Sequence, residues 1–421
     1  MPDNDYLNRE QALEILGIKA ATLYSYVSRG FIRAVPQPGG RASFYLRDDV
    51  EKAKARAEAR AGHGPVAASA MRWGEPVIQT GITEITPQGP RYRSRLATDL
   101  ARQGMAFEGV AEYLWSGQFH DDLPPAQAVA WPAPALPPLL PGWLAQAASL
   151  HKHAHILQLM SAVTIGLGIS EGTRSERIAS GGTVVQSARR LIRALAGTFG
   201  FIGPQAAFHI FGEGETIAGG LLAALRHADE PETRAALNLA LVLCADHELN
   251  PTTFAARVAA STSADLHCCI GAALGAHFGS LVGSMPDKIE EMFVTPLDEK
   301  AILASIKRLT EGARNPPGFN HPAYPKGDPR ALLMIETAGA VARKGSREEV
   351  RRMRAVLDEA HAQYGVVPSI ELGLVVLERA LELPNGSASG LFALGRSAGW
   401  VAHVLEQRLA GFMIRPTAKF V

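Results

Sequence analysis

The chain has 421 residues, which is long for a single small core and favours two or three domains. Hydrophobic residues make up 47% and charged residues 20%, an ordinary balance for a globular protein. The net charge of +1 excludes a protein coated for nucleic acid along its whole length, although it leaves room for a local basic face.

The first segment, residues 1–60, has the pattern of two short helices joined by a tight turn. Asn8 followed three residues later by Gln11 matches a capping box, which predicts that a helix begins there. The predicted apolar face of this helix consists of Ala12, Leu13 and Leu16. Gly17 would end the helix, and a second helix is expected over residues 20–28. Two short helices in this arrangement are the core of a helix-turn-helix.

A small β-hairpin and a charged helix are expected next. Residues 31–33 and 41–45 are predicted strands around a Pro/Gly turn at residues 36–40, and a helix follows from Arg47 to about Arg60. Through "ATLYSYVSRGFI" and "YLRDDVEKAKAR", the segment resembles the MerR-like winged helix-turn-helix. In such modules the second helix enters the major groove and the wing touches the backbone. The resemblance implies DNA contacts from Thr22, Tyr24, Ser25, Arg29 and, in the wing, Arg41.

The charge of this segment gives DNA binding only weak support. Residues 1–62 hold ten Lys or Arg against eight Asp or Glu, whereas binding to phosphates depends on basic side chains. Two interpretations therefore stay open for residues 1–60: a DNA-binding module, or a retained dimerisation or packing module.

A linker and a continuous, mainly helical body are predicted after the first segment. Residues 61–75 are small, Gly/Pro/Ala-rich and aperiodic, as expected of a linker, and the body covers residues 76–421. In residues 77–94, Thr and Ile alternate around a Pro-Gln-Gly turn, which predicts a hairpin. Residues 124–141 are Pro-rich and are expected to be irregular. Later segments have helical periodicity, as over residues 350–364, so the fold class is mainly α.

Two polar clusters stand out in the body. Residues 235–250 are apolar nearly all round, which predicts a buried helix, yet they end in Asp246, His247 and Glu248. Because an unpaired buried charge is costly, this end is expected to open onto a site. Residues 316–330 contain five prolines and two glycines, which excludes regular structure and leaves a loop that presents His321 and Arg330 together.

Three arginines beside apolar or rigid sequence form a second group of candidates. Arg396 lies in an apolar stretch in which Gly395 and Gly399 would allow close helix approach, and a buried arginine requires a carboxylate partner. Arg330 and Arg415 each stand next to a proline. These three cations either converge on a pocket for a small polycarboxylate or are unrelated structural residues.

Four ordered motifs, "ADHELNPTTFAAR", "GFNHPAYPKGDPRA", "GRSAGWVAHVLEQ" and "IRPTAKFV", strongly resemble the citrate synthase family. The likeness covers about residues 76–421. It implies a two-domain helical fold in which a small domain at about 250–370 interrupts the large domain. It also implies a homodimer that condenses acetyl-CoA with oxaloacetate, as in the tricarboxylic acid cycle. No cofactor is implied, since the CoA thioester is a substrate, and no metal site is expected.

The resemblance also assigns roles to individual residues. His247 matches the diacid-binding histidine, and His321 matches the catalytic histidine of the loop. Arg330 and Arg396 match carboxylate-clamping arginines, and Arg415 matches the one that reaches into the partner's site.

Three positions depart from the family pattern. Val282 stands where the enolate-stabilising histidine belongs, and loss of one preorganised donor costs about 100- to 1000-fold in rate. Glu371 stands where the catalytic aspartate belongs, and a misplacement of about 1 Å can cost about 100-fold. Asn320 replaces a loop glycine. His277 lies five residues before Val282, where packing is a more common role than replacement of the missing donor.

Three functions stay open on this basis. The first is a citrate-synthase-type acyltransferase that is slow or acts on an altered substrate. The second is a metabolite sensor that keeps the diacid clamp and reports its occupancy to DNA. The third is a lyase or hydrolase acting on a citryl-CoA-like thioester.

The remaining features concern the compartment. The three cysteines do not suggest a disulfide framework, which favours a reducing cytoplasm. The polar start and the lack of an apolar run of about 18 residues lead us to expect neither export nor membrane insertion.

Overall fold

A computed structural model of the chain describes residues 6–28, 32, 34–36, 43–47, 49–51, 53–54, 78–119, 131, 143, 146, 154–171, 184–312 and 314–416. The chain divides into two compact units, residues 1–79 with 416–421 and residues 80–415, each with its own hydrophobic core. The predicted linker at residues 61–75 and most of residues 124–141 lie outside the described residues. The small domain expected at about 250–370 stays a prediction.

The described part of the first unit includes β1 (Tyr6–Leu7), α1 (Arg9–Leu16), α2 (Ala20–Ser28), β2 (Ala34–Pro36) and β3 (Ser43–Leu46). The predicted capping box is confirmed, because the Asn8 side chain accepts from the Gln11 N–H and the Gln11 side chain accepts from the Asn8 N–H, both at 2.9 Å. Gly17 ends α1 with a φ of 62°, a conformation that favours glycine. Both predicted helices are therefore confirmed.

The three strands form one sheet in the order β1-β3-β2, with β2 and β3 antiparallel. The prediction placed the first wing strand at residues 31–33 and Pro36 in the turn. The strand β2 instead covers Ala34–Pro36, and proline is tolerated there because β2 is an edge strand. Of the predicted charged helix, residues 47, 49–51 and 53–54 are described and are helical.

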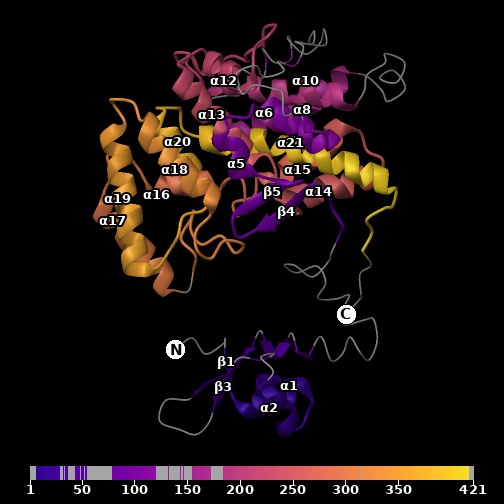
Figure 1. Cartoon of the computed structure of the whole chain (residues 1–421), viewed down its shortest axis with the longest axis vertical. Coiled ribbons are helices and arrows are strands. Elements are labelled where there is room, and N and C mark those ends of the chain that lie inside the picture. The colour runs from indigo at the N-terminus through magenta and orange to yellow at the C-terminus, as the bar shows by residue number, and fades with distance from the viewer. Residues whose placement is uncertain are drawn as a thin grey trace. The chain divides into compact units, whose positions relative to one another are not determined.

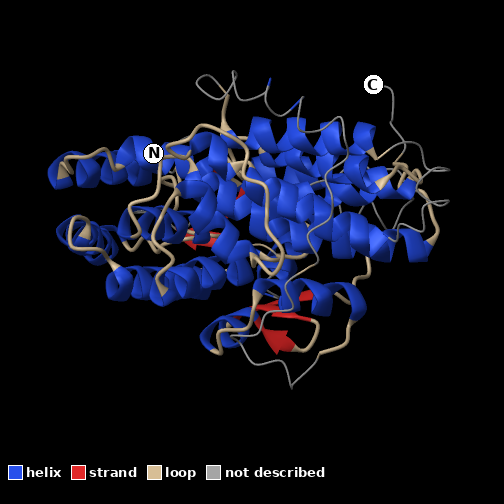
Figure 2. Cartoon of the chain, turned by 90° about the horizontal axis from the view of Figure 1, so that it is seen from above, coloured by secondary structure: helices blue, strands red, loops and turns tan. Residues whose placement is uncertain are grey.

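The described residues of the second unit are mainly helical, as predicted (Figure 2), and include a three-stranded sheet in the order β4-β5-β6. The described elements of this unit are β4 (Thr83–Thr86), β5 (Gly89–Tyr92), β6 (Arg95–Leu96), α5 (Ala97–Arg102), α6 (Phe107–Ser116), α8 (Ile156–Ser170), α10 (Val184–Gly197), α11 (Phe199–Ile202), α12 (Ile217–Leu225), α13 (Pro231–Cys244), α14 (Pro251–Ser261), α15 (Leu266–His277), α16 (Met285–Met292), α17 (Glu299–Glu311), α18 (Pro329–Val341), α19 (Arg347–Tyr364), α20 (Ile370–Ala380) and α21 (Ser387–Ala410). Among the described helices, none has the length and apolar character needed to cross a bilayer.

Two predicted patterns in this unit are confirmed. The alternating segment forms the β4–β5 hairpin, in which Thr86 pairs with Gly89 across the turn. The periodic segment forms α19, whose buried face consists of Val350, Met353, Val356, Leu357 and Ala360.

Five of the described helices in the second unit pack as one connected group. The long helix α21 packs against α13, α14 and α20, and α18 packs against both α13 and α20 (Figure 1). The chain is buried from the C-terminal turn of α13 to His247, which lies three residues beyond the helix. The helices α18 and α20 begin just after irregular segments, residues 314–328 and 365–369. This packing determines where the candidate residues can come together.

Candidate active site

Two glycines of α21 bring this helix against the C-terminal end of α13. A Cβ atom on Gly395 would lie 2.6 Å from the Cβ of Cys244, and the Gly399 N–H donates to the Ala245 carbonyl at 2.8 Å. This approach places Arg396, which is only 1% exposed, at the end of α13, where its Nε donates to the Cys244 carbonyl at 2.9 Å. The predicted role of the glycines is confirmed.

The irregular loop before α18 is fastened to the segment that precedes α20. The Asn320 N–H donates to the Val367 carbonyl at 2.8 Å, and the Asn320 side-chain oxygen accepts from the Val367 N–H at 3.0 Å. Asn320 has a φ of 55°, a left-handed conformation that asparagine adopts more readily than most residues. Asparagine thus adopts this conformation here, and its side chain adds a hydrogen bond beside His321.

His247, His321 and Tyr324 form a cluster of three rings. The two histidine ring centroids are 5.0 Å apart, and the Tyr324 centroid lies 5.6 Å from that of His247 and 5.2 Å from that of His321. The Tyr324 hydroxyl lies 2.9 Å from His247 Nε2. Sequence reasoning missed Tyr324, because an aromatic residue in a Pro-rich loop gives no sign of what its hydroxyl contacts.

Arg330 is held by a buried two-point salt bridge with Asp328. Its Nε lies 3.0 Å from Asp328 Oδ1 and its Nη2 lies 2.7 Å from Oδ2, with both side chains at most 1% exposed. The guanidinium carbon is also 5.5 Å from the Tyr324 ring centroid. Within the described part of the chain the buried Arg330 Nη1 has no hydrogen-bond partner. One charged donor is thus left for a ligand carboxylate.

Glu371 is the second residue of α20, where the positive end of the helix dipole favours a carboxylate. The Ser369 hydroxyl donates to its Oε2 at 2.5 Å. Burial nevertheless raises the pKa of Glu371 above its usual value, although Ser369 and Arg330 act in the opposite direction. A carboxylate with a raised pKa is a better proton acceptor, which suits a general base.

Both histidines of the cluster are neutral at physiological pH. Burial lowers the pKa of His321 to about 4, and the nearby Arg330 and Arg396 contribute to this shift. Burial also lowers the pKa of His247 well below its usual value, again with contributions from the two arginines. Neutral imidazoles offer one N–H donor each and do not compete with Arg330 and Arg396 for an anion.

The charges of several candidate residues act on the buried thiol of Cys244. Burial raises the pKa of this thiol to about 12, with contributions from Arg396, Arg330, Glu371 and Asp328. The structure brings the rings of His247 and His321 together and places Arg330 beside the Tyr324 ring, and the charges of both Arg330 and Arg396 act on His247. That these two arginines bind one polycarboxylate stays a prediction.

The other two residues predicted beside His247 take different positions. Asp246 is fully buried, and its Oδ2 lies 3.3 Å from His403 Nε2. Burial opposes ionisation of Asp246, but His403 and Arg396 outweigh it and lower its pKa. Glu248 is exposed, in a left-handed turn. Asp246 therefore lies buried next to His247 in the sequence, paired with His403, and the charge of Arg396 acts on its carboxylate.

Val282 lies partly buried in the turn that connects α15 to α16, and its N–H donates to the Gly279 carbonyl at 3.0 Å. His277, the last residue of α15, is fully buried beneath this turn, with its ring 5.0 Å from Phe392 and 5.4 Å from Trp400. Burial lowers its pKa to about 3. His277 packs in an apolar environment, outside the His247–His321–Tyr324 cluster.

Arg415 has a different environment from Arg330 and Arg396. It is exposed, in the irregular segment that follows α21, whereas Arg330 and Arg396 are buried. In the first unit, Tyr24 is 51% exposed, and Thr22 and Ser25 are partly buried on α2. The other two predicted DNA contacts, Arg29 and Arg41, lie outside the described residues.

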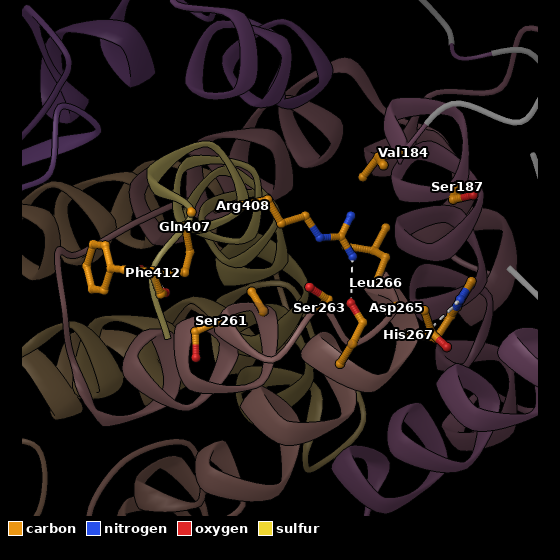
Figure 3. Close-up of a pocket in the computed structure, with 13 residues that line it drawn as sticks. Val184, Ser187, Ser261, Ser263, Asp265, Leu266, His267, Gln407, Arg408 and Phe412 are labelled. Atoms are coloured by element: carbon orange, nitrogen blue, oxygen red, sulfur yellow. Dashed lines mark hydrogen bonds and ion pairs between the residues drawn. The ribbon is translucent and has the colours of Figure 1, made fainter. Parts of the chain in front are cut away.

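A separate cavity of about 420 Å³ lies where the end of α21 meets the α14–α15 connection. Figure 3 shows Arg408 extending along it, between Gln407 and Phe412 on one side and Asp265 and His267 on the other. The Arg408 guanidinium donates to the Ala264 carbonyl at 2.8 Å. None of the predicted catalytic or diacid-binding residues is among those that line this cavity.

Comparison with known proteins identifies one family. Residues 70–417 match the family model described as citrate synthase, C-terminal domain. The chain is 26% identical over 361 residues to a 2-methylcitrate synthase of Corynebacterium glutamicum, covering 81% of this chain and 91% of that protein. It is 29% identical over 198 residues to a citrate synthase of Synechocystis, covering 46% and 50%.

Two solved structures share the fold. A citrate synthase from Thermoplasma acidophilum, in ternary complex with carboxymethyl coenzyme A and oxaloacetate, aligns with a TM-score of 0.70 at 21% identity. The citrate synthase from Thermotoga maritima aligns with a TM-score of 0.67 at 22% identity. Each alignment covers 83% of this chain and 94% of the other.

Proposed function

The chain belongs to the citrate synthase family, and on that premise we propose that it condenses a short acyl-CoA, such as acetyl-CoA, with oxaloacetate or a related 2-oxo diacid and releases CoA. The observation that carries this proposal is the contact between the His247 and His321 rings, with the buried Arg330 beside the neighbouring Tyr324 ring. The charges of Arg396 and Glu371 act on the buried Cys244 thiol together with that of Arg330, which supports it further. The 2-methylcitrate synthase among the relatives keeps the acyl group open between acetyl and a longer chain.

In this proposal Arg330 and Arg396 bind the carboxylates of the diacid. Arg330 is fixed by Asp328 and has one Nη donor without a protein partner. Two cations beside a low-dielectric wall favour a dianion strongly, and a planar guanidinium matches a carboxylate with two parallel hydrogen bonds. His321, which is neutral, then donates its N–H to the carbonyl oxygen of the same diacid, and His247 lies beside it.

Glu371 carries the first chemical step. Its carboxylate takes a proton from the acyl α-carbon, and the resulting enolate forms a C–C bond with the diacid carbonyl carbon. The carbonyl electron pair moves onto the oxygen, which receives a proton. Water then cleaves the thioester C–S bond, releasing CoA. A raised pKa makes Glu371 a stronger base for the first step.

The first prediction concerns Val282, which cannot donate a hydrogen bond to the enolate oxygen. We expect Val282→His to release CoA about 100-fold faster than the wild-type protein, since one preorganised donor at a developing oxyanion contributes about 100- to 1000-fold. The measurement is thiol release from acetyl-CoA in the presence of oxaloacetate. Thermal unfolding of both proteins checks that the variant is folded.

One outcome would contradict the role given to Val282. It is a folded Val282→His variant that binds oxaloacetate but releases CoA no faster than the wild-type protein. This result would mean that the enolate oxygen is stabilised by another group.

The proposal includes a homodimer in which Arg415 completes the partner's site. Its support is that Arg415 is exposed, whereas Arg330 and Arg396 are buried. Large apolar side chains are also exposed nearby in the sequence, namely Leu409, Phe412 and Met413, and on α8, namely Ile165 and Ile169. Exposed apolar side chains of this kind are typical of a protein interface.

A second candidate function is DNA binding by residues 1–60, regulated by the diacid. Two observations favour it. The elements α1, α2, β2 and β3 are those expected of a winged helix-turn-helix. The arginines predicted to bind the diacid are present, whereas Val282 has no side-chain hydrogen-bond donor for the enolate oxygen. We expect binding to duplex DNA that weakens between 50 and 200 mM salt, as phosphate contacts require. Fluorescence anisotropy with and without oxaloacetate measures this. Affinity that is absent at 50 mM salt with and without oxaloacetate would contradict it.

A further inference from the structure

Tyr324 brings a hydroxyl to the centre of the candidate site. The hydroxyl lies 2.9 Å from His247 Nε2, the phenol ring lies 5.2 Å from the His321 ring, and the Arg330 guanidinium is 5.5 Å from the phenol centroid. Tyr324 is 2% exposed. Three groups assigned to the diacid therefore surround one phenol.

The hydroxyl keeps its proton at physiological pH. Burial raises the pKa of Tyr324 to about 12, although Arg330 acts to lower it. His247 is neutral as well, so its ring has one nitrogen with a hydrogen and one without. When Nε2 carries the hydrogen, it donates to the phenol oxygen, and the O–H is left to donate to a ligand. The chain from imidazole to phenol to ligand then strengthens each of its hydrogen bonds.

A donor at this position acts on the atom that gains charge. As the C–C bond forms, the diacid carbonyl oxygen receives the electron pair, and a donor placed in advance stabilises that oxygen more than the neutral carbonyl. Because the Val282 side chain has no hydrogen-bond donor, the acyl half of the proposed site lacks one donor for the enolate oxygen. A phenol O–H at the diacid half lowers the barrier of the step that follows enolate formation.

We propose that Tyr324 is a further catalytic residue, whose hydroxyl, supported by His247, donates a hydrogen bond to the carbonyl oxygen of the bound diacid. This assignment rests on the proposed condensation. It differs from a packing role for the phenol ring, which would depend on the ring and not on the hydroxyl.

The test is Tyr324→Phe, which removes only the hydroxyl. We expect the Kd for oxaloacetate, measured by calorimetry, to rise about fivefold, as for loss of one ordinary hydrogen bond. We expect kcat, measured by thiol release, to fall about 100-fold, because the bond strengthens in the transition state. The control is Tyr364→Phe at the end of α19, where the side chain is only partly buried, and neither value should change.

Two measurements separate failure of this proposal from failure of the condensation. A Tyr324→Phe variant whose Kd and kcat both stay within twofold of wild type overturns the role of Tyr324 and leaves the condensation standing. A wild-type protein that releases no CoA would refute the condensation. In that case the oxaloacetate Kd alone decides, and a Kd unchanged within twofold, or no binding by either protein, overturns the role of Tyr324.

Discussion

Replacing Glu371 with glutamine is expected to lower kcat about 1000-fold, within the range for loss of a general base. Glutamine keeps the size and the hydrogen bond from Ser369, but it cannot accept the proton of the acyl α-carbon. Binding of the diacid should be retained, since Arg330 and Arg396 are unchanged. Thiol release gives kcat, and calorimetry with oxaloacetate gives the affinity.

The pH dependence of the wild-type rate provides a second readout of the same prediction. Burial raises the pKa of Glu371 above its usual value of 4.5. Because the base acts when deprotonated, kcat should fall as the pH is lowered through this raised pKa. His321, with a pKa of about 4, stays neutral above that value. The Glu371→Gln variant should lack this acid limb.

The control is Glu359→Gln, an exposed carboxylate on α19, which should leave both kcat and its pH profile unchanged. If Glu371→Gln keeps more than a tenth of the wild-type kcat, another group removes the proton and the assignment of Glu371 is wrong.

Asp328→Ala is expected to reduce the free energy of unfolding of residues 80–415 by about 3–5 kcal/mol, the usual cost of breaking a buried ion pair from one side. Arg330 would keep a buried charge with two lost hydrogen bonds, at Nε and Nη2. The side chain of Asp328 also caps α18 by accepting from the Arg330 N–H at 3.0 Å. Urea unfolding followed by circular dichroism measures the change.

The matched control is Asp298→Ala, which removes the cap of α17 without touching a buried arginine. Asp298 accepts from the Ala301 N–H at 3.0 Å, so its loss should cost only about 1 kcal/mol. Equal losses in the two variants would show that Asp328 acts as a helix cap and not through Arg330.

The fold could be predicted where the signal is local. The capping box at Asn8, the end of α1 at Gly17 and the buried face of α19 follow from spacing alone, and the structure confirms them. The glycines of α21 also marked a close approach, although the sequence could not say that Cys244 was the neighbour. The sequence predicts a turn at Pro36, because proline is tolerated in a strand mainly at the edge of a sheet. That β2 is such an edge strand is seen only in the folded sheet.

The site could be predicted only in part, for a related reason. His247, His321, Arg330, Arg396 and Glu371 stand in recognisable motifs, whereas the roles of Asp328 and Tyr324 depend on what lies beside them in space. Asn320 illustrates the same limit, since the sequence does not show that its backbone is left-handed, with a φ of 55°, or that its side chain binds the Val367 N–H. His277 was indistinguishable in sequence from a substitute donor until its ring was placed against Phe392 and Trp400.

The most direct test of the condensation is to supply the purified protein with oxaloacetate and acetyl-CoA labelled with ¹³C in the acetyl group, and to identify the product by mass spectrometry. We expect labelled citrate in a one-to-one ratio with released CoA, formed slowly by the wild-type protein and faster by Val282→His. Labelled acetate with no new C–C bond would indicate a thioester hydrolase and contradict the account. So would a complete absence of CoA release from a protein that binds oxaloacetate.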